Sequence, residues 1–310
     1  MKLSLIVPCY NEAENVAEFQ AATIQAFEGC GYDFEIIFID DGSKDTTLHQ
    51  LKKIHAAQLC PVKVISFSRN FGKEAAIYAG LKHSDANYIS IIDADLQQRP
   101  EIVRNMVEIL EKNKEYDVVA AFQDSRKESK LLTFFKKSFY KTINKLSSVD
   151  LKADASDFRT FRRSVAESII SLAEYHRFSK GIFSWIGYNT HYIPYEVCPR
   201  SAGVSKWSFR KLFNYAIDGI IGFSTKPLRI ATFLGILSAI AAFIYLIVVI
   251  LQKCIWGIDV PGYATIVVLV LFFGSLQLFC IGIIGEYVGR TFEQSKDRPI
   301  YIAKEIISDK

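Results

Sequence analysis

The chain has 310 residues, enough for one large domain or two ordinary ones. Its formal net charge of +4 is too small to indicate a nucleic-acid partner. Half of the residues are hydrophobic, and most of the apolar excess lies in two long runs after residue 229. The six cysteines form no CxxC pair, so a zinc site has no support. The first apolar stretch ends at Pro8 and is too short for a signal peptide, so we interpret it as a buried strand.

From residue 3 to about residue 122, short segments rich in Ile and Val alternate with helical ones. The predicted strands are Leu3–Val7, Glu35–Asp40, Lys63–Ser68, Tyr88–Asp93 and Asp117–Phe122. The predicted helices are Glu12–Phe27, Thr46–Ala57, Lys73–Lys82 and Pro100–Lys112. This order predicts a parallel sheet covered by helices on both faces. Ligands of such sheets bind outside the carboxyl ends of the strands, so polar residues there are the candidates for chemistry.

Two further segments combine lysines with apolar residues. Between residues 129 and 149 there are five lysines and no acid, and apolar residues recur every four positions at Leu131, Phe135, Phe139 and Ile143. Such a basic amphipathic helix suits an anionic membrane surface, although a helix packed on the core with solvated lysines fits equally well. The second segment, Lys206–Lys226, leads into the first long apolar run, which favours an interfacial position.

The two long apolar runs, Ile230–Leu251 and Tyr263–Gly285, carry no charge over 22 and 23 residues. About 20 apolar residues suffice to cross the hydrocarbon core, so both runs predict transmembrane helices rather than a buried hairpin. Basic residues flank their outer ends at Lys226, Arg229, Arg290, Lys296 and Arg298. This positive-inside bias places both termini and the large domain in the cytoplasm. Small residues in the runs permit helix association, which leaves a homo-oligomer open.

Acidic residues gather at the ends of three predicted strands. The end segments are Pro8-Cys9-Tyr10-Asn11-Glu12, Asp40-Asp41-Gly42-Ser43 and Asp93-Ala94-Asp95-Leu96-Gln97. Such carboxylates repel one another unless a cation or hydrogen-bond donors compensate, and Mg²⁺ or Mn²⁺ prefers oxygen ligands shared with substrate phosphates. In Asp-X-Asp on an extended chain the side chains point to opposite faces, so one can hold a metal while the other faces a sugar. A lone Asp-X-Asp is weak evidence, and Asp41-Gly42-Ser43 is also typical of a turn.

These motifs, in this order, resemble glycosyltransferase family 2, which has the GT-A (Rossmann-like) fold. Further segments are similar to the polyprenyl-phosphate glycosyltransferases, relatives of dolichol-phosphate mannose synthase and the bactoprenol glucosyltransferases: Ser68–Glu74, Asp157–Arg159, Arg200–Trp207, Gly285–Arg290 and Arg298–Tyr301. The resemblance implies an α/β domain with a mostly parallel sheet and two C-terminal transmembrane helices. We expect a cytosolic catalytic domain at 1–205, an interfacial segment at 206–227, two spans at 228–289 and a cytosolic tail at 290–310.

The resemblance also implies roles for single residues. It places nucleotide-sugar contacts on Pro8, Tyr10, Asn11, Glu12, Asp40, Asp41, Lys73 and Asp93. It places ligands of Mg²⁺ or Mn²⁺ on Asp93, Asp95 and Gln97. It implies a catalytic role for Asp95, and for Asp157 as acid/base or acceptor-orienting carboxylate. It places contacts to the acceptor phosphate on Arg126, Arg200, Ser201 and Lys206. Arg126 and Lys73 could equally be solvated surface residues.

A phosphate monoester loses its second proton near pH 6, so the acceptor needs positioning more than deprotonation. The resemblance implies an inverting transfer from a nucleotide-sugar donor to a polyprenyl phosphate, with UDP-glucose and undecaprenyl phosphate as the leading pair. UDP-N-acetylhexosamine, or GDP-mannose with dolichyl phosphate, comes next. A protein or glycan acceptor is the alternative within enzymes, and a non-catalytic scaffold or flippase subunit is the alternative from another class. We expect an integral membrane protein, such as one of a bacterial plasma membrane.

Overall fold

The computed structural model describes residues 2–123, 155–196, 219–256 and 262–308. Within them the strands form one mixed sheet in the order β7-β5-β6-β4-β1-β2-β3-β8. The strands are β1 (Lys2–Cys9), β2 (Asp33–Asp40), β3 (Val62–Phe67), β4 (Tyr88–Ile91), β5 (Val118–Gln123), β6 (Ala155–Arg162), β7 (Thr190–Tyr195) and β8 (Ala303–Ile307). The helices are α1 (Val16–Phe27), α2 (Thr47–Ala56), α3 (Lys73–Lys82), α4 (Pro100–Lys112), α6 (Arg163–Ser171), α7 (Ser179–Trp185), α9 (Lys226–Trp256) and α10 (Tyr263–Ser295).

The centre of the sheet is parallel, from β4 through β1 and β2 to β3. Alternate side chains of β1 enter different cores: Leu3, Leu5 and Val7 pack on one face, and Ile6 packs on the other. Helices α1, α2 and α4 supply the first core, whereas α3, α6 and α7 supply the second. The prediction of a parallel sheet with helices on both faces is confirmed for this part of the chain.

Some element bounds differ from the prediction. Helices α3 and α4 have the predicted bounds. Strand β4 ends at Ile91, so Asp93 and Asp95 lie in the turn that follows rather than on an extended strand. Helix α1 begins at Val16 rather than Glu12, because the segment before it forms a turn.

Strands β6 and β7 were not predicted. Strand β6 lies between β4 and β5 and runs antiparallel to both of them. Because β6 runs in the opposite direction to β4, the start of β6 lies beside the end of β4. The start of β6, with Asp157, therefore lies at the same edge as the residues that follow β4.

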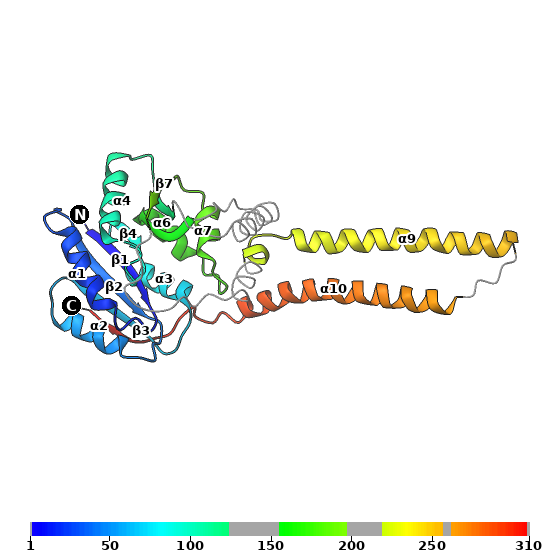
Figure 1. Ribbon diagram of the computed structural model, residues 1–310, viewed down its shortest axis with the longest axis horizontal. Helices are drawn as coiled ribbons and strands as arrows, with labels where there is room; N and C mark the ends of the chain where they lie inside the picture. Colours follow the sequence, from blue (N-terminus) through cyan, green and yellow to red (C-terminus); the bar gives the residue numbers. More distant parts are fainter. Residues whose placement is uncertain (1, 124–154, 197–218, 257–261, 309–310) are drawn as a thin grey trace.

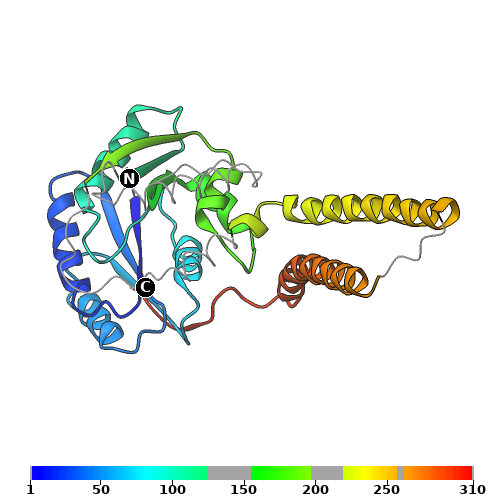
Figure 2. The same ribbon diagram turned by 45° about the vertical axis from the view of Figure 1, so that its right-hand side comes forward.

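Helices α9 and α10 run away from the sheet domain as a hairpin (Figures 1 and 2). Their candidate spans, Lys226–Gln252 and Thr265–Ser295, have mean hydropathies of 2.9 and 2.6 in their most apolar windows, of which no part is buried inside the structure. Large side chains such as Phe233 and Leu271 are each 64% exposed. Uncovered apolar surface of this extent marks an interaction site, and the length suits lipid. Both predicted apolar helices are present.

After α10 the chain returns to the sheet, as Figure 2 shows. Strand β8 pairs antiparallel with β3 at the edge of the sheet. Just before it, Tyr301 stacks on Phe67 with ring centroids 5.0 Å apart, and its hydroxyl lies 3.1 Å from a ring nitrogen of His83. The segment predicted only as a tail therefore contributes a strand to the sheet domain.

Candidate active site

The loops that follow β1 and β2 are locked together at the carboxyl edge of the sheet. The amide of Asn11 donates to the hydroxyl of Ser43 at 3.0 Å, and the amide of Lys44 donates to Asn11 Oδ1 at 2.8 Å. The amide of Glu12 donates to the hydroxyl of Thr47 at 2.9 Å. Asn11 adopts a φ of 55°, in the left-handed region that Asn tolerates better than most residues. The first predicted motif thus has a rigid backbone at this edge.

Asp40 is buried and both of its carboxylate oxygens accept internal hydrogen bonds. Oδ1 accepts from the amide of Ser43 at 3.0 Å, and Oδ2 accepts from the hydroxyl of Ser66 at 2.8 Å. Pro8 and Tyr10 lie half-buried nearby at the end of β1. Nucleotide contacts by these three residues stay predictions, and the structure shows that Asp40 also fixes the turn after β2.

Asp41 holds the loop that leads into α3. Its carboxylate accepts from the amide of Phe71 at 2.6 Å and from the amide of Gly72 at 2.9 Å. Burial raises the pKa of Asp41 to about 6, although these hydrogen bonds oppose the rise. Gly42 packs so closely that an added Cβ would lie 2.4 Å from the carbonyl carbon of Arg69. The predicted turn is therefore also the support of the loop before Lys73.

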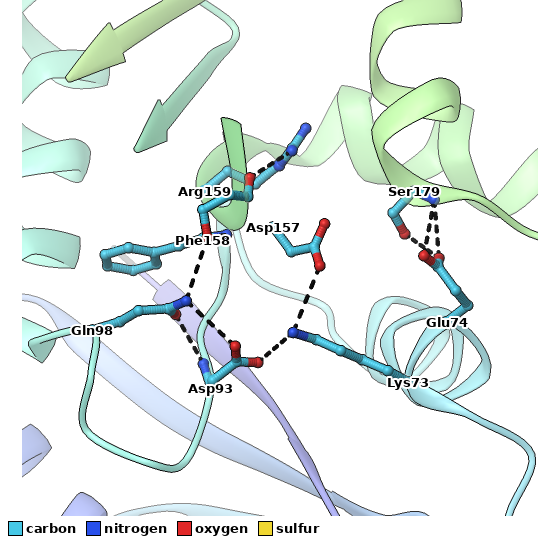
Figure 3. A network of polar contacts seen from close by, with 9 residues as sticks. Lys73, Glu74, Asp93, Gln98, Asp157, Phe158, Arg159 and Ser179 are labelled. Atoms are coloured by element: carbon cyan, nitrogen blue, oxygen red, sulfur yellow. Dashed lines mark hydrogen bonds and ion pairs between the residues drawn. The ribbon is translucent and has the colours of Figure 1, made fainter. Parts of the chain in front are cut away.

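Lys73 lies between two carboxylates that come from different parts of the chain (Figure 3). Its Nζ is 2.6 Å from Asp93 Oδ1 and 3.6 Å from Asp157 Oδ2. Desolvation disfavours the ammonium, yet Asp93 and Asp157 together raise the pKa of Lys73 above its ordinary value. The structure thus brings together three of the predicted site residues, from the first turn of α3, the turn after β4 and the start of β6.

One carboxylate oxygen of Asp157 has no hydrogen-bond partner in the part of the chain that the structure describes. Its Oδ1 is buried and makes no hydrogen bond with any described residue. Burial alone would raise the pKa of Asp157, but the charges of Lys73, Lys180 and Arg159 hold it below its ordinary value. A buried acceptor without a donor among the described residues is uncommon, which makes Asp157 a candidate for a functional role.

Gln98 is a site residue that the sequence did not reveal. The amide of Asp93 donates to Gln98 Oε1 at 3.0 Å, and Gln98 Nε2 donates to Asp93 Oδ2 and to the hydroxyl of Ser156, each at 3.4 Å. Gln98 therefore ties the turn after β4 to the start of β6 (Figure 3). Its neighbour Gln97 belongs to the predicted motif, whereas the sequence does not indicate that Gln98 is buried.

The predicted metal ligands lie in the turn after β4. Among the residues that the structure describes, no three or more His, Cys, Asp or Glu side chains are grouped to hold an ion. Asp93 is engaged by Lys73, whereas Asp95 is partly exposed, with its Oδ1 accepting from the amide of Gln97 at 3.2 Å. A carboxylate and an amide oxygen fit Mg²⁺ or Mn²⁺, which commonly take their other ligands from substrate phosphates and water. The oxygen ligands of Asp95 and Gln97 therefore fit an ion that binds together with a diphosphate.

Some of the predicted residues lie outside the described parts of the chain. They are the acceptor-phosphate candidates Arg126, Arg200, Ser201 and Lys206, the basic helix at 129–149 and most of the interfacial segment at 206–227. The roles predicted for them stay predictions.

Comparison with known proteins decides the family. Residues 4–170 match glycosyl transferase family 2, and residues 226–291 match the GtrB C-terminal hairpin. The chain belongs to glycosyltransferase family 2. The prophage bactoprenol glucosyl transferase homolog of Escherichia coli K12 is 40% identical to this glycosyltransferase over 307 residues, covering 99% of each chain. The bactoprenol glucosyl transferase of Shigella phage SfV is 39% identical over 304 residues, covering 98% of each chain.

A solved structure shares the fold of this glycosyltransferase. Glucosyl-3-phosphoglycerate synthase from Mycobacterium tuberculosis, in complex with Mn²⁺, UDP and phosphoglyceric acid, aligns with a TM-score of 0.51 and 18% sequence identity. The alignment covers 71% of this chain and 76% of that chain. The predicted GT-A fold, the polyprenyl-phosphate branch and the assignment as a glycosyltransferase are therefore confirmed.

Proposed function

We propose that this glycosyltransferase moves glucose from UDP-glucose to a polyprenyl phosphate, with inversion at the anomeric carbon. The observation that carries the proposal is the cluster of Lys73, Asp93 and Asp157, which lies at the carboxyl edge of a domain joined to two uncovered apolar helices. The names of the bactoprenol glucosyl transferases, to which the chain is similar over nearly its whole length, support glucose and a lipid phosphate.

The reaction that suits this cluster is a single displacement. An oxygen of the acceptor phosphate forms a bond to the anomeric carbon while the bond from that carbon to the donor diphosphate breaks, and UDP leaves with the electron pair. The acceptor has lost its second proton at neutral pH, so the step needs no strong base. A carboxylate with a lowered pKa is itself a weak base, so Asp157 acts by positioning the reactants and Lys73.

The donor diphosphate becomes more negative as it leaves. Lys73, held in the charged form by Asp93 and Asp157, is a cation suited to lie near the leaving diphosphate. Asp95 and Gln97 would hold Mg²⁺ or Mn²⁺, which supplies further neutralisation of that charge when bound. Pro8, Tyr10, Asn11 and Glu12 would line the nucleoside at the end of β1.

The helical hairpin sets the place of reaction. We infer that α9 and α10 cross a membrane, with residues 1–205 as the catalytic domain, 206–227 as an interfacial segment, 228–289 as the spans and 290–310 on the same side as the catalytic domain. The flanking basic residues favour the cytoplasmic side for this domain. Anchoring reduces the search for a lipid phosphate to two dimensions.

The test uses the full chain purified in detergent, with undecaprenyl phosphate, Mg²⁺ or Mn²⁺, and a panel of radiolabelled nucleotide sugars. We expect label from UDP-glucose in the organic phase, and none after chelation of the metal or with undecaprenol in place of its phosphate. Asp95→Ala is expected to abolish transfer. Asp85→Asn, an exposed carboxylate before β4, is the matched control and keeps wild-type activity.

Each alternative gives a different result. Label in the lipid from UDP-N-acetylhexosamine or GDP-mannose, but not from UDP-glucose, would change the proposed donor. The assignment as a polyprenyl-phosphate glycosyltransferase would stand. Donor binding with no labelled lipid would reject the lipid acceptor and favour a protein or glycan. An absence of both binding and metal-dependent hydrolysis would favour a scaffold or flippase subunit.

A further inference from the structure

Glu74, beside Lys73 in the first turn of α3, makes a long-range contact that the mechanism above does not use. The amide of Ser179 donates to both carboxylate oxygens of Glu74 at 3.1 Å, and the Ser179 hydroxyl also donates to Oε2. Ser179 is buried and is the first residue of α7 (Figure 3). Glu74 therefore joins the start of α3 to the start of α7, across 105 positions in the sequence.

This junction is one of two side-chain attachments at the start of α3. Helix α3 has no side-chain cap, and its N-cap position is Gly72 with a φ of 97°. Two groups hold this start on opposite sides of Lys73: Asp41 binds the amides of Phe71 and Gly72, and Ser179 binds Glu74. The backbone of Lys73 lies between these two attachments, so both fix the position of its Cα atom.

The charges around Glu74 belong to the same cluster. Burial, and then the charge of Asp157, raise the pKa of Glu74 to about 7, while the Ser179 hydrogen bonds and Arg177 oppose the rise. Arg177 lies over the ring of Tyr78 at 4.6 Å and donates to the carbonyl of Ile169 at 3.4 Å. The charged neighbours of Glu74 are thus Lys73 of its own helix, Asp157 of β6 and Arg177 of the segment before α7.

We propose that Glu74 is a positioning residue for glucosyl transfer: by binding Ser179 it holds Lys73 between Asp93 and Asp157. The inference rests on the proposed function for its effect on the rate, whereas its effect on Lys73 does not depend on the identity of donor or acceptor. As a positioning residue, Glu74 acts through Lys73 and not by contact with donor or acceptor. Its removal changes the alignment of Lys73 more than the binding of donor or lipid.

The kinetic test compares Glu74→Gln and Ser179→Ala with matched controls. Glu18→Gln replaces an exposed glutamate in the first turn of α1, and Ser171→Ala replaces an exposed serine of α6. We expect Glu74→Gln to lower kcat about tenfold or more, because small misplacements of charged groups are costly, with both KM values within about twofold. Ser179→Ala keeps the backbone amide that donates to Glu74, so its kcat should fall less than that of Glu74→Gln. The double variant is no slower than Glu74→Gln, because both changes break one contact.

The second readout follows Lys73 directly by competitive labelling with acetic anhydride and mass spectrometry. An amine held between two carboxylates reacts slowly, so Glu74→Gln is expected to raise the labelling of Lys73 at least about threefold relative to Lys82 of the same helix. Unchanged labelling of Lys73 would overturn the inference, whether or not transfer is observed. A lowered melting temperature with wild-type kcat per folded molecule would also overturn it. If the wild type labels no lipid, the proposed function fails and the Lys73 labelling still decides this inference.

Discussion

The ammonium of Lys73 lies 3.6 Å from Oδ2 of Asp157, while Oδ1 of Asp157 has no hydrogen-bond partner among the described residues. One oxygen of this carboxylate thus contacts the cation, and the other, which is buried, stays available as a hydrogen-bond acceptor. A carboxylate arranged in this way orients its neighbours while it is itself ionised. Whether Asp157 acts as a general base or as a positioning group can therefore be tested from the pH dependence of kcat.

We expect Asp157→Asn to lower kcat by about 100-fold, through misplacement of Lys73 and the acceptor, without removing the acid limb of the pH profile. Below about pH 6 the acceptor phosphate gains a proton, so the rate falls on that side in both proteins. The measurement is kcat between pH 5 and 8.5. A limb that vanishes in Asp157→Asn would make Asp157 the general base. Asp85→Asn should reproduce the wild-type profile.

Gly42→Ala is expected to destabilise the protein more than Gly29→Ala. Both glycines have a positive φ, 63° and 70°, so both variants carry about 1–2 kcal/mol of backbone strain. Only Gly42 faces a collision, 2.4 Å from the backbone of Arg69, while nothing lies within 4 Å of a Cβ at Gly29. Overpacking adds about 1–3 kcal/mol. Equal melting temperatures for the two variants would show that the loop before Lys73 shifts to accommodate the added methyl group without loss of stability.

Tyr301→Ala is expected to cost about 1–3 kcal/mol of unfolding free energy, because it removes the stack on Phe67 and the contact with His83. Ile302 is its neighbour and is 52% exposed, so Ile302→Ala serves as the control and should change stability by less than about 0.5 kcal/mol. Thermal unfolding in detergent measures both. A Tyr301→Ala protein as stable as the control would mean that β8 alone holds the edge.

Asp41 makes the stability of the domain depend on pH. Its folded-state pKa of about 6 lies above the ordinary value of 3.8, so the folded state binds a proton that the unfolded state releases between these values. This group therefore contributes stability that grows as pH falls from 7 towards 4, by at most about 3 kcal/mol. Asp41→Asn should remove this contribution.

The Asp41 experiment compares melting temperatures at pH 5 and 7.5 in the wild type and in Asp41→Asn. The wild type should lose more stability than the variant on going to the higher pH, and Asp85→Asn should behave as the wild type. Identical pH dependence in Asp41→Asn would show that Asp41 ionises without penalty in the fold.

The proposed membrane orientation can be tested with a native thiol. Cys254 is exposed near the far end of α9, whereas Cys30 and Cys60 are in the sheet domain. With that domain in the cytoplasm, a membrane-impermeant maleimide should label intact spheroplasts, and Cys254→Ser should abolish the labelling. Permeabilisation should restore labelling to Cys254→Ser through the other thiols. Equal labelling of both proteins before permeabilisation would contradict the orientation.

Local patterns account for what the sequence could predict. Helices α3 and α4 and the central strands follow from apolar spacing and turn residues, and the acidic motifs follow from strand ends that lie side by side. The place of β6 could not be predicted, because its pairing with β4 joins residues about 70 positions apart. For the same reason the sequence predicts only a tail where β8 lies.

The missed site residues have the same explanation. Gln98 and Ser179 are ordinary polar residues whose importance lies in partners that local sequence does not name: the turn after β4 and the start of α3. Glu74 lies within the segment that resembled the family, but only the fold shows that it faces α7 rather than solvent. Burial of a polar side chain is set by tertiary packing, which local periodicity does not encode.

The pairing of β8 with β3 also has a consequence for biosynthesis. A ribosome makes β3 early and β8 only after both apolar helices, so β3 stays an open edge throughout synthesis of the hairpin. Open edges invite pairing with other chains until they are covered. A chain interrupted anywhere in the hairpin keeps that edge exposed, and a completed one hides it. Closure of the sheet by β8 therefore requires that both apolar helices have already been made.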